Sequence, residues 1–177
     1  MNKILETNRL VLREFENSDA ENMFELNSDR EVIKYTGDKP FESIKQAKYF
    51  LSNYSDYKKN GFGRWAVIEK ETNNFIGWCG LKSNEDSFVD IGFRFLRRFW
   101  GKGYATESAK ACLDYGFQKL NLNEIVGRAN KENNQSICVL EKIDMSFWKN
   151  GSCCGDKSAV YYRINKTQFE TKSFPPK

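Results

Sequence analysis

Apolar residues recur along this chain with two different spacings, and segments of the two kinds alternate. Strict alternation of apolar and polar residues and short apolar runs are typical of β-strands, whereas apolar residues three or four positions apart are typical of α-helices. The strand pattern occurs at 10–13, 65–68, 75–81, 88–95, 124–129, 147–148 and 159–164. Residues 72–74, Thr-Asn-Asn, predict a hairpin-like connection between the second and third of these segments.

Helical spacing follows recognisable helix-start signals. Ser18-Asp-Ala-Glu21 forms a capping box before one helix, and Ser43 with Gln46 precedes a second segment, which Gly61 closes. A longer helix is predicted to begin near Thr106, and another at Asn133 or Asn134. Their apolar stripes are Met23, Phe24 and Leu26; Ala47, Phe50, Leu51 and Tyr54; Ala105, Ala109, Cys112, Leu113, Phe117 and Leu120; and Ile137, Leu140 and Ile143.

This order of elements predicts an α/β chain, α+β in the broad sense, with a mixed sheet and helices on both of its faces. The 177 residues are enough for one domain that buries about 70% of its unfolded surface. We expect a single domain over residues 1–170. Residues 171–177 contain Pro175-Pro176 and are predicted to form a flexible tail.

A glycine-bearing turn separates the strand at 88–95 from the long helix. Gly101 and Gly103 carry no Cβ, so the backbone can come close to a ligand there. The unpaired N–H groups of the following helical turn point at the same place, and the helix dipole favours negative charge. This arrangement predicts an anion site, most often one for phosphate. A tight turn that binds nothing has the same spacing and stays an open alternative.

Two common nucleotide motifs do not fit this turn. In the P-loop a Lys and a Ser or Thr follow the second glycine, but here Lys102 lies between the glycines. The dinucleotide pattern G-x-G-x-x-G lacks its third glycine, because Thr106 occupies that position. The turn also lies in the middle of the chain, which argues against a Rossmann fold.

The segment Trp100-Gly-Lys-Gly-Tyr-Ala-Thr-Glu107 resembles the acetyl-coenzyme A loop of GNAT-type N-acetyltransferases, whose pattern is [Q/R]-x-x-G-x-[G/A]. Trp100 takes the Gln/Arg position in the usual frame, as in the branch that resembles ribosomal-protein N-terminal acetyltransferases. Arg98-x-x-Gly101-x-Gly103 satisfies the pattern two residues earlier. In either register the resemblance implies that the pyrophosphate contacts Arg98, Trp100, Gly101, Lys102, Gly103, Tyr104, Ala105 and Thr106.

Other landmarks of that branch follow in order. Residues 7–14 resemble its opening strand, 75–81 its IG-x-x-G-L strand, and 90–93 its EIGY strand, with Asp90 in place of Glu. Residues 132–143 resemble EN-x-x-S-x-x-V-L-E-K-L, but Asp144-Met145 replaces the Gly-Phe that ends this motif. We therefore expect an irregular turn after that helix.

The resemblance implies a GNAT-like mixed, mostly antiparallel sheet that splays apart between the strands at 88–95 and 124–129. Acetyl-coenzyme A would place its pantetheine arm in this cleft. Backbone groups of Phe95 and Leu96 would pair with the pantetheine amides in the manner of an added strand. Asn133 would bind the same arm, although a helix N-cap is an equally simple role for that residue.

The implied reaction is direct transfer of acetyl from the thioester to a primary amine. The family's usual acid, a tyrosine, corresponds here to Leu140, so Ser136 is our candidate for stabilising the departing sulfur. Asp90 is our candidate for the base, acting through water. Its alternative role is a strand-edge carboxylate that pairs with an arginine. Glu107 is interpreted as a first-turn residue that the helix dipole favours.

The lack of histidine excludes several kinds of chemistry. It removes Ser-His-Asp and Cys-His nucleophiles and His-ligated zinc. The five cysteines are odd in number and contain no C-x-x-C pair, so we expect neither a disulfide framework nor a metal site. Cys79 and Cys112 are expected to be buried, Cys138 to pack in its helix, and Cys153 with Cys154 to be exposed loop thiols.

Charge and hydropathy also restrict the class of protein. The net charge of +4 suits a polyanionic ligand, but the basic residues are scattered, so nucleic acid is not an expected partner. No apolar run approaches the roughly 20 residues that span a membrane. The start of the chain lacks a secretory signal, and the expected location is the cytoplasm.

Three hypotheses follow: an acetyl-coenzyme A-dependent amine N-acetyltransferase, a non-catalytic coenzyme A-binding module, and a basic nucleic-acid-binding domain. The first is favoured. A protein or peptide N-terminus, with a pKa near 8, loses its proton more easily than a lysine-like amine near 10.4. Without histidine, the chain suits that acceptor better than a polyamine or aminoglycoside, which remain alternatives. A monomer or a homodimer is expected.

Overall fold

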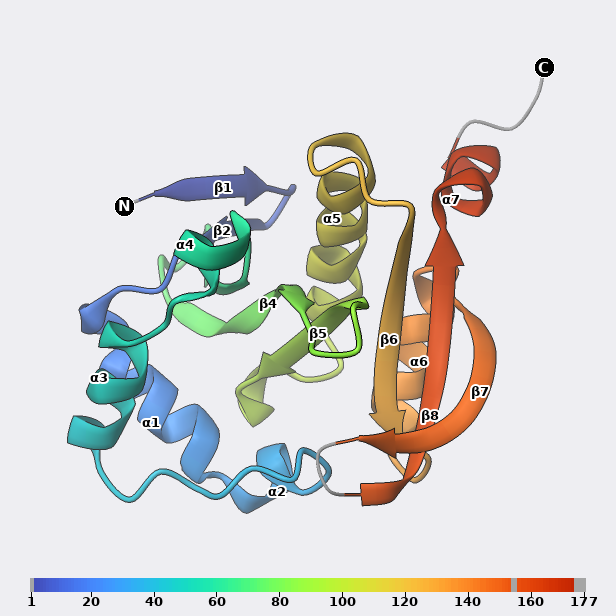
Figure 1. The fold of residues 1–177 in the computed structure, drawn as a ribbon. Coiled ribbons are helices and arrows are strands. Elements are labelled where there is room, and N and C mark those ends of the chain that lie inside the picture. Colours follow the sequence, from blue (N-terminus) through green and yellow to red (C-terminus); the bar gives the residue numbers. More distant parts are fainter. Residues whose placement is uncertain (1, 154–155, 174–177) are drawn as a thin grey trace.

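The computed structural model describes residues 2–153 and 156–173. Its strands form one eight-stranded sheet in the order β1-β2-β3-β4-β5-β6-β8-β7 (Figure 1). The strands are β1 (Lys3–Glu6), β2 (Leu10–Arg13), β3 (Arg64–Glu69), β4 (Phe75–Ser83), β5 (Val89–Phe95), β6 (Glu124–Asn130), β7 (Ser146–Cys153) and β8 (Asp156–Asn165). Each predicted strand is present, and β1 is an addition that the pattern did not reveal.

All neighbouring strands are antiparallel except β5 and β6. These two are parallel and pair only at Asp90 with Val126 and at Ile91 with Gly127. Beyond this point their C-terminal ends diverge (Figure 1). The predicted mixed, mostly antiparallel and splayed sheet is therefore confirmed.

Helices cover both faces of the sheet, as predicted. The helices are α1 (Ala20–Ser28), α2 (Arg30–Ile33), α3 (Ile44–Ser52), α4 (Asp56–Asn60), α5 (Tyr104–Gln118), α6 (Asn134–Lys142) and α7 (Lys166–Ser173), with 3-10 turns η1 (Asn17–Asp19) and η2 (Arg97–Phe99). Residues of α1, α2 and α3 form one apolar core with Ala66 and Ile68 of β3. Residues of α5 and α6 form the other core with Trp65 and Val67, which point to the opposite face.

The start of α1 differs from the predicted capping box. Asp19 is turned back to β2, where its carboxylate pairs with Arg13 at 2.6 Å and accepts the Glu16 N–H at 2.9 Å. Because Asp19 is held in this way, residues 17–19 form the 3-10 turn η1 and α1 begins only at Ala20. The other start is as predicted, since Ser43 Oγ accepts the Gln46 N–H at 3.2 Å before α3.

The turn after α6 and the C-terminal segment differ from expectation, and α7 is a helix that the pattern did not reveal. Asp144 adopts φ +67°, and the Met145 N–H donates to Leu140 O at 3.1 Å. This is a regular Schellman turn with aspartate where glycine is usual, so the expected irregularity is absent. At the C-terminus, Phe169 stacks on Phe117 with ring centroids 4.8 Å apart. The helix α7 continues to Ser173, so 171–173 are helical, while 174–177 lie outside the described residues.

Candidate active site

The turn between β5 and α5 has the geometry that its two glycines predict. Gly101 and Gly103 adopt φ +73° and +82°, a left-handed conformation that L side chains rarely take. The helix α5 starts at Tyr104, two residues earlier than predicted. Its first backbone hydrogen bond runs from the Glu107 N–H to Gly103 O, at 3.0 Å. The N–H groups of the preceding three residues are therefore the helix's unpaired donors.

The N-terminal hairpin holds this turn from behind. Arg9 pairs with Glu107 at 2.6 Å, and its Nη1 also donates to the Lys102 carbonyl at 3.1 Å. Thr7 Oγ1 donates to Glu107 Oε1 at 2.6 Å. Burial raises the pKa of the Glu107 carboxyl, but the bonds from Thr7 and Arg9 outweigh it and hold that pKa below its ordinary value. Glu107 is thus a structural anchor as well as a first-turn acid, a role that the sequence did not indicate.

The side chains on the loop have specific partners. Tyr104 is buried beneath Arg9 and its hydroxyl donates to Glu69, so only its backbone can meet a ligand. Arg98 pairs with Glu25 of α1, and Lys102 Nζ lies 5.1 Å from the Phe99 ring centre. Ala105 and Thr106 are half-buried in the first turn of α5.

The turn leaves room for an anion beside its backbone. A Cβ on Gly101 would meet no atom within 4 Å, and one on Gly103 would meet only Arg9 Nη2 at 3.5 Å. The space beside both glycines is therefore open to a ligand. The N–H groups of the first helical turn border that space, as an anion requires.

The free edge of β5 begins where β6 diverges. The Leu96 N–H donates to Ile76 O and its carbonyl accepts from Phe99, so the backbone of Leu96 faces β4 and η2. In an antiparallel pair the alternate residues, Phe93 and Phe95, direct their backbone groups to the opposite edge. Phe95 and Phe93 therefore face the free edge, whereas the backbone groups of Leu96 are already bonded within the chain. Pairing of this edge with pantetheine stays a prediction. Trp100 closes one end of the edge, because its indole N–H donates to Phe95 O at 2.7 Å.

Asn133 and Ser136 lie together at the start of α6, directly after the divergent end of β6. Asn133 Oδ1 accepts the Ser136 N–H at 3.1 Å, so Asn133 is an N-cap. Its amide nitrogen takes no part in this bond. Ser136 is half-buried, and Leu140, at the family's tyrosine position, is 2% exposed in the core.

Asp90 is paired with an arginine, which was its alternative role. Both of its carboxylate oxygens lie 3.0 Å from Arg64 Nη2, and Asn84 Nδ2 donates to one of them at 3.0 Å. The Arg64 side chain crosses the sheet over Gly92, where a Cβ would lie 2.6 Å from its Cζ. The role of Asp90 as a base stays a prediction. The sequence did not indicate that Arg64 reaches Asp90. The only related feature is the pair Gly80 and Gly92, which leaves room for the Arg64 side chain but becomes a pair only in the sheet.

The described cysteines provide no nucleophile at this site. Cys79 and Cys112 are buried as predicted, with sulfurs 3.7 Å apart, and burial raises the pKa of the Cys112 thiol well above its ordinary value. Cys138 is exposed, so the packing role expected for it is wrong. It lies on the solvent side of α6, whose sheet side carries Leu140. Cys153 ends β7 and Cys154 lies outside the described residues.

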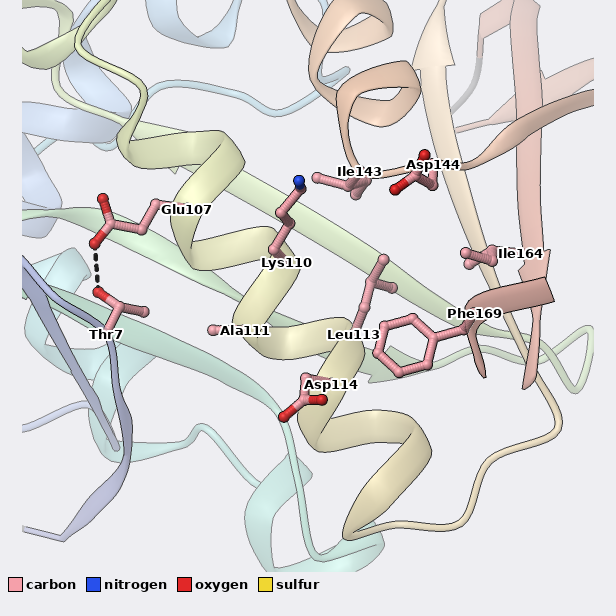
Figure 2. Close-up of a pocket in the computed structure, with 10 residues that line it drawn as sticks. All are labelled: Thr7, Glu107, Lys110, Ala111, Leu113, Asp114, Ile143, Asp144, Ile164 and Phe169. Atoms are coloured by element: carbon pink, nitrogen blue, oxygen red, sulfur yellow. Dashed lines mark hydrogen bonds between the residues drawn. The ribbon is translucent and has the colours of Figure 1, made fainter. Parts of the chain in front are cut away.

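A separate groove of about 590 Å³ runs over the solvent side of α5. Figure 2 shows it between Thr7 at one end and Ile143, Asp144 and Phe169 at the other, with Lys110 above α5. None of the residues that line it belongs to 97–106 or to the divergent strand ends. The groove therefore contains none of the predicted site residues.

No helix in the described part of the chain is long and apolar enough to cross a membrane.

Comparison with known proteins agrees with this geometry. Residues 9–146 match the family model described as Acetyltransferase (GNAT) domain. A Bacillus licheniformis protein named as an uncharacterized N-acetyltransferase, p20, is 39% identical over 150 residues, which cover 83% of each chain. A GNAT-family acetyltransferase structure from Bacillus anthracis is 30% identical with a TM-score of 0.77, covering 92% of this chain and 98% of that one.

A third comparison concerns a more distant structure. The spermidine N-acetyltransferase of Vibrio cholerae, solved with CoA and spermine, has a TM-score of 0.77 at 22% identity, covering 92% of this chain and 99% of that one. At this identity the likeness shows the fold alone. The family model and the two relatives of 30% or higher identity show that the chain belongs to the GNAT family and is an acetyl-CoA-dependent N-acetyltransferase.

Proposed function

We propose that this enzyme acetylates an α-amino group or an amine of similarly low pKa, with a peptide or protein N-terminus as the favoured acceptor. The proposal includes the likeness to the ribosomal-protein N-terminal acetyltransferase branch. The observation that carries the acetyl-CoA part of it is the glycine turn at the N-terminus of α5, next to the edge of β5 that β6 leaves unpaired. The acceptor part rests on the lack of histidine.

The backbone binds the acetyl donor in this proposal. N–H groups of residues 101–106 hold the pyrophosphate, and Arg98 and Lys102 add positive charge beside it. Phe93 and Phe95 pair with the pantetheine arm, and Asn133 contacts that arm from α6. The bound thioester supplies an activated acetyl group. A backbone N–H on the free edge of β5 polarises its carbonyl.

Two side chains handle protons and charge. Asp90 lies at the first of the two paired positions of β5 with β6, one residue before Ile91, after which the strands separate. Its carboxylate, oriented by Arg64 and Asn84, accepts the amine proton through water. Ser136 donates a hydrogen bond to the departing sulfur, in place of the tyrosine whose position Leu140 holds.

The acceptor follows from the kind of base that the chain offers. Without histidine, the candidate base is a carboxylate, which suits an amine with a pKa near 8 better than one near 10.4. A small polycationic amine is the second candidate, since the Vibrio cholerae protein is named for spermidine.

The test is coenzyme A thiol release at saturating acetyl-CoA with a peptide panel, spermidine and an aminoglycoside as acceptors. We expect the highest kcat/KM with a peptide N-terminus. A hundredfold preference for either polycation would reverse the assignment. Acetyl-CoA binding without amine-dependent release would favour a non-catalytic module.

A further inference from the structure

Three arginines with little exposure surround the point where β5 and β6 separate. The side chains of Arg64, Arg94 and Arg128 are 13%, 11% and 12% exposed. Alternate residues of a strand share one face of the sheet, so Arg94 lies on the same face as Asp90. Arg128 lies two residues after Val126, the partner of Asp90, and so shares that face. Arg94 and Arg128 therefore flank the separating strands on the face that α1 covers.

Two exposed carboxylates form ion pairs with Arg94 and Arg128. Asp38 pairs with Arg94 at 2.6 Å, and Asp86 pairs with Arg128 at 2.8 Å. The side chains of Asp38 and Asp86 are 55% and 44% exposed, and both lie in loops. Each ion pair thus joins an arginine of the sheet that is little exposed to an exposed carboxylate of a loop.

Arg94 is held in place without Asp38. Its Nη1 donates to Asn27 Oδ1, and Asn27 is 7% exposed on α1. The Arg94 guanidinium also lies 5.3 Å from the Trp78 ring centre. Asp38 follows Gly37, φ +73°, in the stretch between α2 and α3 that has no regular structure. The Asp38 side chain is 55% exposed and Arg94 keeps its other contacts, so a carboxylate from outside can replace Asp38 without unfolding the site.

We propose that Arg94 is a specificity residue that binds a carboxylate carried by the acceptor, and that Asp38 occupies the position of this carboxylate in the free enzyme. The acceptor class is an amine with a carboxylate within one or two residues of it, such as an amino acid, a dipeptide or a peptide with an acidic second residue. Arg128 adds positive charge on the opposite side. This inference rests on the proposed function, because it assigns the acceptor of the same site.

The same cluster disfavours a polyamine as acceptor. In the free enzyme each arginine is paired with one carboxylate, Arg64 with Asp90, Arg94 with Asp38 and Arg128 with Asp86, so the charges balance. A polycation brings no carboxylate to replace Asp38, and an Arg94 left unpaired by displacement of Asp38 repels a second amine.

The test compares matched acceptors that differ only in the carboxylate: glycylglycine against its amide, and Gly-Asp-amide against Gly-Asn-amide. In thiol release, the wild type should favour the acid of at least one pair by about tenfold in kcat/KM. Arg94→Gln should abolish this preference mainly through KM, and Arg94→Lys should restore part of it. Asp38→Asn should increase the preference, because it removes the competing anion.

The control is Arg30→Gln, which removes one exposed positive charge from α2 and should leave the preference unchanged. Equal kcat/KM for acid and amide in both pairs would overturn the inference while leaving the acetyltransferase proposal intact. A second readout is the rise in melting temperature that each acceptor gives in saturating coenzyme A. A rise with acids alone, lost in Arg94→Gln but without turnover, would support the carboxylate site and refute acetylation of these amines. Equal rises with acids and amides would refute the site.

Discussion

Replacement of Glu107 by glutamine tests whether the N-terminal hairpin holds the pyrophosphate turn in place. One carboxylate oxygen of Glu107 accepts hydrogen bonds from the Thr7 hydroxyl at 2.6 Å and from the Arg9 backbone N–H at 3.0 Å. The other oxygen accepts from the Arg9 side chain. Arg9 in turn holds the Lys102 carbonyl. Glutamine keeps one acceptor oxygen but loses the charge and the second acceptor. The turn should then lose part of its support.

The magnitude follows from the exposure of the pair. Hydrogen bonds to charged groups contribute about 1.5–3 kcal/mol. The Glu107 side chain is 19% exposed but that of Arg9 is 43% exposed, so solvent screens part of this energy. We expect Glu107→Gln to lower the free energy of unfolding by about 1–2 kcal/mol. For a chain of this length the melting temperature should fall by about 2–8 °C.

The pH dependence has a definite sign. The pKa of Glu107 in the folded chain lies below its ordinary value of 4.5, so its contribution is complete above that value. It is lost as the pH falls through the folded-state pKa. The difference in unfolding free energy between wild type and Glu107→Gln should therefore be largest at neutral pH and shrink in acid.

The assay is urea unfolding at several pH values together with acetyl-CoA titration. Glu21→Gln is the matched control, because Glu21 is an exposed first-turn acid of α1 and shares only the helix-dipole effect. Acetyl-CoA should bind more weakly to Glu107→Gln than to Glu21→Gln. Equal stability losses in the two variants, or a Glu107 deficit that grows in acid, would refute the anchoring role.

Three further substitutions test the chemistry. Asp90→Asn should lower turnover, most strongly below pH 8 where the amine is protonated, and leave acetyl-CoA affinity largely intact in titrations; an unchanged pH–rate profile would place the base elsewhere. Ser136→Ala should lower kcat by about 10- to 100-fold if the hydroxyl assists the departing sulfur, and an unchanged kcat would remove that role. Gly92→Ala places a Cβ 2.6 Å from Arg64, so it should displace the guanidinium from Asp90 and reproduce the Asp90→Asn rate defect, whereas wild-type turnover would show that the ion pair is dispensable.

The local features of this fold were predictable from the sequence. The strands of the sheet and the long helix follow from apolar spacing, and the Gly101 and Gly103 turn follows from residue type alone. The strand β1 was not predicted because Lys3–Glu6 is short and has no fully buried residue, so its apolar and polar residues show no clear alternation. The start of α1 was predicted wrongly because Asp19 pairs with Arg13 of β2, a contact that helix-capping rules do not include.

Features that depend on strand register could not be read from the chain. Arg64 reaches Asp90 only because Gly80 and Gly92 lie side by side on adjacent strands. Leu96 faces β4 because its N–H is paired with Ile76, and a shift of one residue would have turned it to the cleft. The residue types of the site were therefore predictable, but their partners were not.

The central claim is that the α5 turn binds acetyl-CoA for transfer to an amine, and Gly103→Val tests it most directly. Valine is strained at φ +82° and projects into the open space beside the turn. The measurement is amine-dependent thiol release by wild type and variant, with far-UV circular dichroism to show that both are folded. We predict release by the wild type, and loss of both release and the acetyl-CoA-induced rise in melting temperature in the variant. A folded Gly103→Val protein that binds acetyl-CoA and turns over like the wild type would contradict the account.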